Sequence, residues 1–179
     1  MNSARLTPDW KSCFGSLCDS PVEPISRDDI DAAHPVVAFD AHWRTLATDG
    51  PPLRTALHAP DIPHLLKWLM ILEAGEEAGR PTFHVRLEGT AACALSHSDL
   101  TGLELAEFTT GDSYHSRLAA LQEVIARGEP RFGRALLREE GHAGVLTSVG
   151  MFPFRTSMEG GHQVVVVAAP DDLELRQML

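Results

Sequence analysis

The segment Thr82–Glu88 constrains the fold more than any other stretch, because it reads as a strand whose two faces differ in chemistry. Successive side chains of a strand point to opposite faces of its sheet. One face is expected to carry Phe83, Val85 and Leu87. The other face is expected to carry His84, Arg86 and Glu88. This division predicts a strand that is buried on one face and only partly covered on the other.

Four further apolar runs read as strands, and short helices lie between the second strand and the third. These strands are expected at residues 68–73, 131–138, 145–155 and 163–169. Helices are expected at 90–95, from the capping-box pair Thr101 and Glu104 to Phe108, and from Asp112 to a cap at Gly128. This order predicts an α+β fold, with a five-stranded antiparallel sheet and short helices on one face.

The first 50 residues are expected to form an N-terminal extension that precedes the sheet domain and contains a helix. Residues 1–26 are polar and have no periodicity, which predicts a loosely ordered lead-in, and residues 27–50 predict an amphipathic helix. The dipeptide His34-Pro35 either breaks this helix or restarts it at Pro35. An apolar stripe follows at Val36, Phe39, Trp43 and Leu46. The stripe either packs on the core of its own domain or forms a dimer seam, and the sequence leaves both open.

Composition narrows the class of partner and the compartment. The chain has 179 residues and a net charge of -10, without a basic run, which disfavours nucleic-acid partners. Its three cysteines leave one unpaired in any scheme, which favours a reducing compartment. The N-terminus does not read as a signal peptide, and no apolar run is long enough to span a bilayer. We therefore expect a cytoplasmic protein.

Catalytic motifs are absent from the sequence, which predicts a protein that is not an enzyme. There is no nucleophile elbow, zinc-protease helix, phosphate loop or dinucleotide fingerprint. The nine histidines form no pair at the one-turn spacing of a helix, so we expect no metal site, and no cofactor is identified. His97 and His115 lie near the middle helices, where a haem ligand is one hypothesis and an ordinary turn histidine is the favoured one.

The order of elements and several motifs resemble the PAS fold, and more narrowly a bacterial subgroup of stand-alone PAS-like proteins. The resemblance covers about residues 36–169. Its motifs are the helix that contains Trp43, PDIPHLLKWLMILE at 60–73, FHVRLEGT at 83–90, SDLTGLEL at 98–105, PRFGR at 130–134 and GMFPF at 150–154. The chain departs from the subgroup at residues 54–60, where RTALHAP replaces a more polar stretch.

The resemblance implies a PAS-like domain at residues 51–170, followed by a tail at 171–179. It implies a sensory or signalling module that acts through protein–protein interaction, as a homodimer with an unidentified signalling partner. The inner face of the sheet and the middle helices would enclose a small-molecule cleft. Cleft candidates are Phe83, Val85, Leu87, Leu95, His97, Phe108 and Tyr114. Candidates for helix packing or dimer contact are Val36, Phe39, Trp43, Leu46 and Arg86.

Two other functions stay open at this point. The first is a haem- or small-molecule-binding sensor in the strict sense, with an apolar cavity under the middle helices. The second is a small enzyme, which ranks last because a fold does not imply an activity. If the alternation of the strand at Thr82–Glu88 were reversed, Arg86 would line the cleft instead of the outer face.

Overall fold

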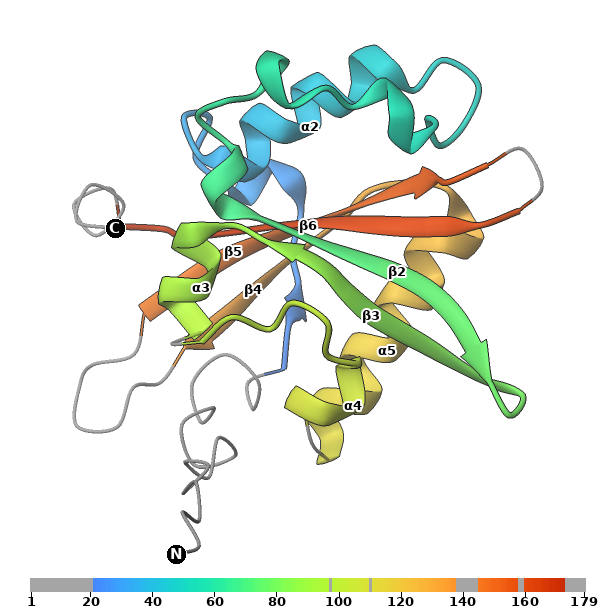
Figure 1. Ribbon diagram of the computed structural model, residues 1–179. Helices are drawn as coiled ribbons and strands as arrows, with labels where there is room; N and C mark the ends of the chain where they lie inside the picture. The colour runs from blue at the N-terminus through green and yellow to red at the C-terminus, as the bar shows by residue number, and fades with distance from the viewer. Residues whose placement is uncertain (1–20, 97, 110, 138–144, 158–159, 173–179) are drawn as a thin grey trace, which may run out of the picture.

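The computed structural model describes residues 21–96, 98–109, 111–137, 145–157 and 160–172. A six-stranded antiparallel sheet lies between two layers of helices (Figure 1). The strands follow the order β1-β4-β5-β6-β2-β3 across the sheet. They are β1 (Glu23–Pro24), β2 (Leu69–Glu77), β3 (Arg80–Glu88), β4 (Arg131–Leu137), β5 (Val145–Arg155) and β6 (His162–Pro170). The predicted α+β fold with an antiparallel sheet is confirmed.

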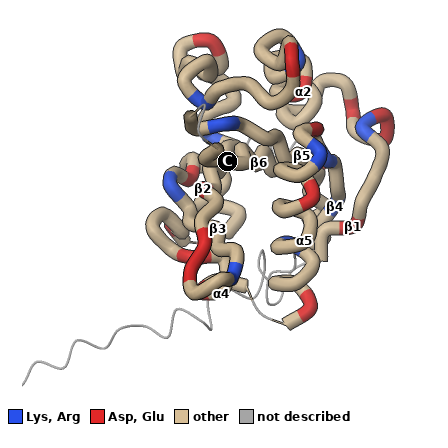
Figure 2. Tube along the Cα trace, turned by 90° about the vertical axis from the view of Figure 1, so that its right-hand side faces the viewer, with Lys and Arg blue, Asp and Glu red and all other residues tan. Residues whose placement is uncertain are grey.

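The helices divide between the two faces of this sheet. Those described are α2 (Pro35–Leu46), α3 (Thr90–Ser96), α4 (Leu105–Phe108) and α5 (Gly111–Arg127), with 3-10 turns at Arg27–Asp29, Arg54–Ala56, Ala59–Asp61 and Leu66–Trp68. Figure 1 shows α2 above the sheet and the other three helices below it. A view turned by 90° shows the same layers, with α4 and α5 opposite α2 (Figure 2). We call the face under α2 the outer face and the face under α3, α4 and α5 the inner face.

The sixth strand corrects the expectation of a loose lead-in as far as residue 26. Residues 1–20 lie outside the described part of the chain, but Glu23 and Pro24 pair with Arg134 and Gly133 of β4. The close approach depends on Gly133, because a Cβ atom there would lie 2.3 Å from the Val22 side chain. This pairing could not be read from a two-residue segment, because a strand so short has no detectable alternation.

The N-terminal helix is shorter than the predicted range of residues 27–50. A 3-10 turn at Arg27–Asp29 comes first, and α2 then begins at Pro35. Proline lacks a backbone donor and disfavours helical dihedrals in the residue before it, so His34 is extended. The His34 ring caps the helix, because its Nδ1 accepts from the Val36 backbone N–H at 3.1 Å. Its Nε2 lies 3.1 Å from the carbonyl oxygen of Ala169, which ties the helix to β6.

The outer face is packed closely beneath α2. Phe39 and Phe152 are fully buried, with ring centroids 4.8 Å apart in an edge-on arrangement. Trp43 also reaches β5, where its indole N–H donates to the carbonyl oxygen of Pro153 at 3.0 Å. The helix lies directly on the strand at Gly150, since a Cβ atom there would be 2.7 Å from Val36 Cγ1. The stripe predicted from the sequence therefore packs within its own chain.

The hairpin of β2 and β3 contains a β-bulge that changes the faces of its last residues. Ile71 pairs with Leu87 and Leu72 pairs with Val85, so Arg86 is an extra residue on β3. The strict alternation predicted from the sequence fails after this point. Leu87 turns outward and is 46% exposed, whereas Glu88 turns to the inner face. The hairpin is also longer than predicted, because its turn is at Ala78 and Gly79, both with positive φ.

Two smaller features concern the inner helices. The capping box of α4 is formed by Glu104 and Glu107, so the prediction that Thr101 begins this helix is wrong. Gly128 follows α5 with a φ of 68°, as expected of a left-handed helix cap.

Among the described residues, no helix combines the length and the apolar character needed to cross a membrane.

Candidate functional site

A cavity lies between the inner face of the sheet and α3, α4 and α5. Its volume is about 60 Å³ when only positions open to the centre of a water molecule are counted. One water needs roughly 10–15 Å³ on this measure, so the space suits a few waters or a small organic molecule. The sheet contributes Met70, Leu72, Val149, Met151, Val166 and Ala168. The helices contribute Ala92, Leu95, Leu105, Phe108 and Leu121. A haem macrocycle is much larger than this volume.

The cavity arises from small and flexible side chains on alternate positions of the central strands. Val149 and Met151 of β5 lie on the inner face, two residues apart, as do Val166 and Ala168 of β6. Ala92, Ala135 and Ala168 leave space that larger side chains would fill. The methionines at positions 70 and 151 are unbranched and polarizable, and such side chains adapt readily to irregular gaps.

Glu88 places a carboxyl group in this largely apolar wall. One carboxylate oxygen accepts from the Ser96 hydroxyl at 3.1 Å, and the other accepts from the Leu100 backbone N–H at 2.8 Å. Burial raises the pKa of Glu88, and these hydrogen bonds oppose that rise. Glu88 thus joins the end of β3 to α3 and to the loop that leads into α4.

A thiol and a second carboxylate lie beside Glu88. Ligand atoms of Glu88, Cys93 and Asp99 all lie within 4.8 Å of one another. Burial raises the pKa of the Cys93 thiol to about 11, and the charges of Glu88 and Asp99 add to the effect. Cys93 is therefore a protonated thiol near neutral pH, which does not favour a role as a reactive thiolate.

Three other polar side chains reach the cavity. Thr109 follows α4, and its hydroxyl donates to the carbonyl oxygen of Leu105. Thr147 belongs to β5, and Arg117 belongs to α5. The Arg117 Nε donates to the Ser113 hydroxyl at 3.4 Å, one turn back along the helix. The site can therefore bind an apolar body and orient a polar group.

The structure brings only part of the predicted cleft set to this cavity. Leu95 and Phe108 line it. Phe83 and Val85 are buried in the adjoining inner core without lining the cavity, and half-buried Tyr114 packs against that core. The placement of Leu87 is a correction, because the bulge turns it to the outer face. His97 lies outside the described residues, and exposed His115 lies with its Nδ1 3.0 Å from the Gly111 carbonyl oxygen.

Several lining residues were missed in the sequence, and some of them carried a usable signal. Arg117 and Leu121 are four residues apart on α5, so helical spacing alone places them on one side. Met70 and Leu72 are two residues apart on β2, so the alternation of a strand places both on one face. Glu88 carried no such signal, because a bulge is not visible in an alternating sequence.

The residues predicted for helix packing or dimer contact lie on the outer side of the sheet. Val36, Phe39 and Trp43 are buried in the chain's own core, and Leu46 is partly buried against it. Arg86 is exposed and forms an ion pair with Glu73. A dimer contact through the buried stripe would require α2 to leave the sheet.

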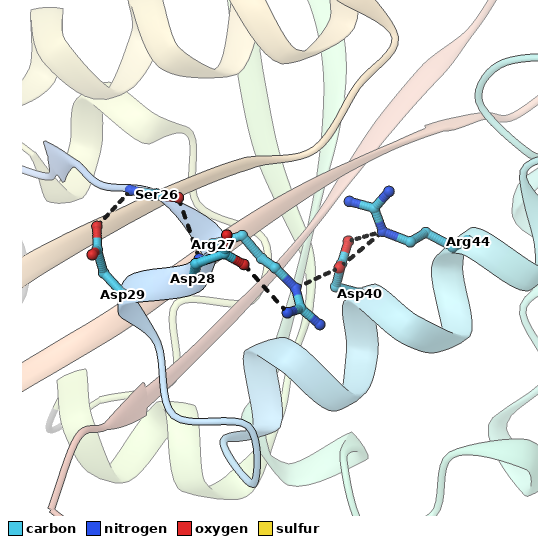
Figure 3. A network of polar contacts seen from close by, with 6 residues as sticks. All are labelled: Ser26, Arg27, Asp28, Asp29, Asp40 and Arg44. Atoms are coloured by element: carbon cyan, nitrogen blue, oxygen red, sulfur yellow. Dashed lines mark hydrogen bonds and ion pairs between the residues drawn. The ribbon is translucent and has the colours of Figure 1, made fainter.

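A buried carboxylate anchors α2 from its polar side (Figure 3). The Asp40 side chain is 1% exposed and accepts from Arg27 Nε at 3.2 Å and from Arg44 Nε at 2.9 Å. Arg27 belongs to the preceding 3-10 turn, which begins with a capping box between Ser26 and Asp29. The carboxylate therefore fixes the incoming chain to the helix. This network holds the cover of the outer face in place, remote from the cavity lining.

Comparison with known proteins agrees with this architecture. No curated protein is similar to the chain at a significant level. The family model described as a PAS domain matches residues 32–166, which include α2, the inner helices and most of the sheet. PAS domains are generally non-catalytic sensory modules that commonly mediate protein interaction and dimerisation. The match covers well over half of the chain, and with the antiparallel sheet and its inner helices it shows that the chain belongs to the PAS domain family.

Proposed function

We propose that this protein is a non-catalytic sensory module that binds a small ligand in the inner cavity and transmits the change to a partner protein. The observation that carries the proposal is the contrast between the two faces of β5 and β6. The inner face leaves an apolar space of about 60 Å³, whereas the outer face is filled by aromatic side chains. A cavity of this kind, with a few convergent polar groups, is typical of a ligand site.

The same strands offer a route from the cavity to the outer face. Met151 lines the cavity, and its neighbour Phe152 packs beneath α2. On β6, Val166 faces the cavity and Val167 belongs to the outer core. A ligand that shifts either strand would therefore move side chains under α2, because close-packed interiors transmit small displacements.

Xenon is a suitable first probe, because it is a small apolar atom and needs no knowledge of the natural ligand. In NMR spectra of the intact chain, dissolved xenon should shift methyl signals of Met70, Leu95 and Met151 strongly and the Phe152 ring signals only weakly, because that ring lies on the other face of β5. The variant A168I should abolish these shifts by filling the space. The control A41L also adds carbon atoms, but on the exposed side of α2, and should leave the shifts intact. The absence of shifts in the unmodified chain would refute the proposed ligand site.

The proposal includes partner binding and a homodimer. The dimerisation common among PAS domains supports it. Because the apolar stripe of α2 is buried in cis, a second copy would meet the exposed side of α2 or the surface of the β2–β3 hairpin. Light scattering over a wide range of protein concentrations tests the homodimer. A mass of one chain at every concentration would contradict it.

A further inference from the structure

The carboxyl group of Glu88 distinguishes this cavity from a purely apolar one. The β-bulge at Arg86 turns Glu88 to the inner face, and its described contacts come from neutral donors, namely the Ser96 hydroxyl, the Leu100 N–H and the Cys93 thiol. An ionised carboxylate offers about four acceptor positions. Three donors leave about one of these positions, so Glu88 can accept a further hydrogen bond from a molecule in the cavity.

The electrostatic surroundings of Glu88 favour a positively charged donor. Asp99 lies beside it and adds a second negative charge, while Cys93 is a neutral thiol near pH 7. An anionic group placed against Glu88 would be repelled by both carboxylates. An ammonium group would be attracted by both, and its N–H donors would form charge-assisted hydrogen bonds.

The remainder of the cavity sets the size and character of the ligand. Leu95, Met151 and Ala168 are among its apolar walls, which suit a hydrocarbon chain. The volume of about 60 Å³ is well below the roughly 150 Å³ of an engineered cavity that binds benzene, so it suits about two or three carbon atoms. We propose that the cavity recognises a small primary ammonium compound with a short apolar chain, whose ammonium group binds the Glu88 carboxylate. This assignment rests on the proposed function, since it names the chemistry of the same cavity.

Two features of the site favour other occupants and define the competing results. Arg117 also lines the cavity and would attract a carboxylate, although its Nε already donates to the Ser113 hydroxyl. The cluster of Glu88, Cys93 and Asp99 has the donor atoms of a divalent-metal site. We favour the ammonium compound because the cavity continues from Glu88 into an apolar space, which a bare metal ion would leave empty.

Three probes of nearly equal size separate these possibilities: propylammonium, 1-propanol and propionate. Their affinities are measured by NMR titration of the intact chain near pH 7. We expect propylammonium to bind roughly tenfold or more tightly than 1-propanol, because hydrogen bonds to charged groups contribute about 1.5–3 kcal/mol and 1.4 kcal/mol is a factor of ten. Propionate should bind more weakly than 1-propanol.

The variant E88Q should reduce the affinity for propylammonium to that for 1-propanol, without changing the affinity for 1-propanol. The side-chain amide is nearly isosteric and its oxygen can still accept from Leu100, so the fold should persist. The variant E76Q removes the same charge from the exposed hairpin and should leave all three affinities unchanged.

Equal affinities for propylammonium and 1-propanol, or a preference for propionate, would overturn the ammonium assignment but would still support a ligand site in the cavity. A Zn²⁺ titration of a variant with Cys13 and Cys18 replaced by serine tests the metal. Binding that is lost when Cys93 is also replaced would overturn the ammonium assignment in favour of a metal site. Failure of xenon and all three probes to bind would refute the ligand site itself. These results distinguish the failure of the ligand class from the failure of the proposed function.

Discussion

The two faces of the central sheet are built from the same strands but are packed by different kinds of side chain. Under α2, the rings of Phe39 and Phe152 fill the space, and Gly150 leaves room for the Val36 side chain of the helix against β5. Under the inner helices, methionines, alanines and the Glu88 carboxyl leave a cavity. The difference shows that a space inside a domain comes from the choice of side chain at alternate positions, since the backbone of β5 is common to both faces.

We expect the largest difference in stability between variants at two neighbouring residues of β5 that lie on opposite faces of the sheet. Phe152→Ala should lower the free energy of unfolding by about 3–5 kcal/mol, because it removes a fully buried ring from a close-packed layer. Met151→Ala should cost about 2 kcal/mol, because the adjoining cavity is lined by side chains that can relax. Urea denaturation of both variants measures the difference. Equal losses would contradict the contrast between the faces.

The second expected effect concerns the close packing of α2 on the outer face. Gly150→Ala should destabilise the protein by about 2 kcal/mol, because the new Cβ atom would lie 2.6 Å from the Phe152 ring and 2.7 Å from Val36 Cγ1. Gly75→Ala is the matched control on β2, where the nearest atom is the Thr82 hydroxyl oxygen at 3.1 Å and the side chain can turn away. Thermal unfolding should show a clear loss only for the first variant. A tolerated Gly150→Ala would mean that α2 is not held against β5.

The third prediction concerns the polar anchor of α2. Asp40→Asn should cost about 1–2 kcal/mol, because it removes the charge that accepts from Arg27 and Arg44. The loss is moderate since the two arginine side chains are 40% and 61% exposed and regain water. Asp61→Asn, at an exposed position, should have little effect on urea denaturation. Xenon binding should be unchanged in both variants, because Asp40 acts on the outer face.

We expect the smallest effects at the polar end of the cavity, in the alkylation rate of Cys93. This rate is measured in a variant with Cys13 and Cys18 replaced by serine. The Cys93 pKa of about 11, against an ordinary 9.0, predicts alkylation by iodoacetamide at pH 8 that is roughly a hundredfold slower than for a free cysteine. The rate should rise with pH until the thiol ionises near pH 11. Glu88→Gln and Asp99→Asn should each speed the reaction by less than tenfold, because each removes a charge that opposes the thiolate. A thiol as reactive as a free cysteine would show that these groups do not converge.

Much of the element order could be predicted from the sequence, because local pattern governs it. The run Val145–Arg155 was predicted with the bounds that β5 has in the structure, and the cap at Gly128 was also correct. Pro35 marked one of two possible helix starts, and the backbone dihedrals of His34 decide between them. These features depend on residues adjacent in the chain, where proline and glycine restrict or extend the allowed dihedrals.

The composition of the site could be predicted only in part. Leu95 and Phe108 were placed near the cleft from their positions in short helices, whereas Met70, Met151 and Glu88 were not. Leu87 and Glu88 exchanged faces relative to the alternating pattern because the register of β2 against β3 shifts by one residue. That register is set by pairing between strands, and alternation within one strand carries no record of it.

The sequence by itself determined the order of the five longer strands and of the inner helices, and that the chain would make an antiparallel α+β domain of PAS type. Only the tertiary structure decided that α2 covers the outer face in cis, that residues 23–24 add a sixth strand, and that Glu88 enters the cavity. The physical reason is the distance along the chain over which each interaction acts. Dihedral preferences and hydrophobic periods act within a few residues, whereas a cavity is defined by side chains from strands and helices that meet only after the chain has folded.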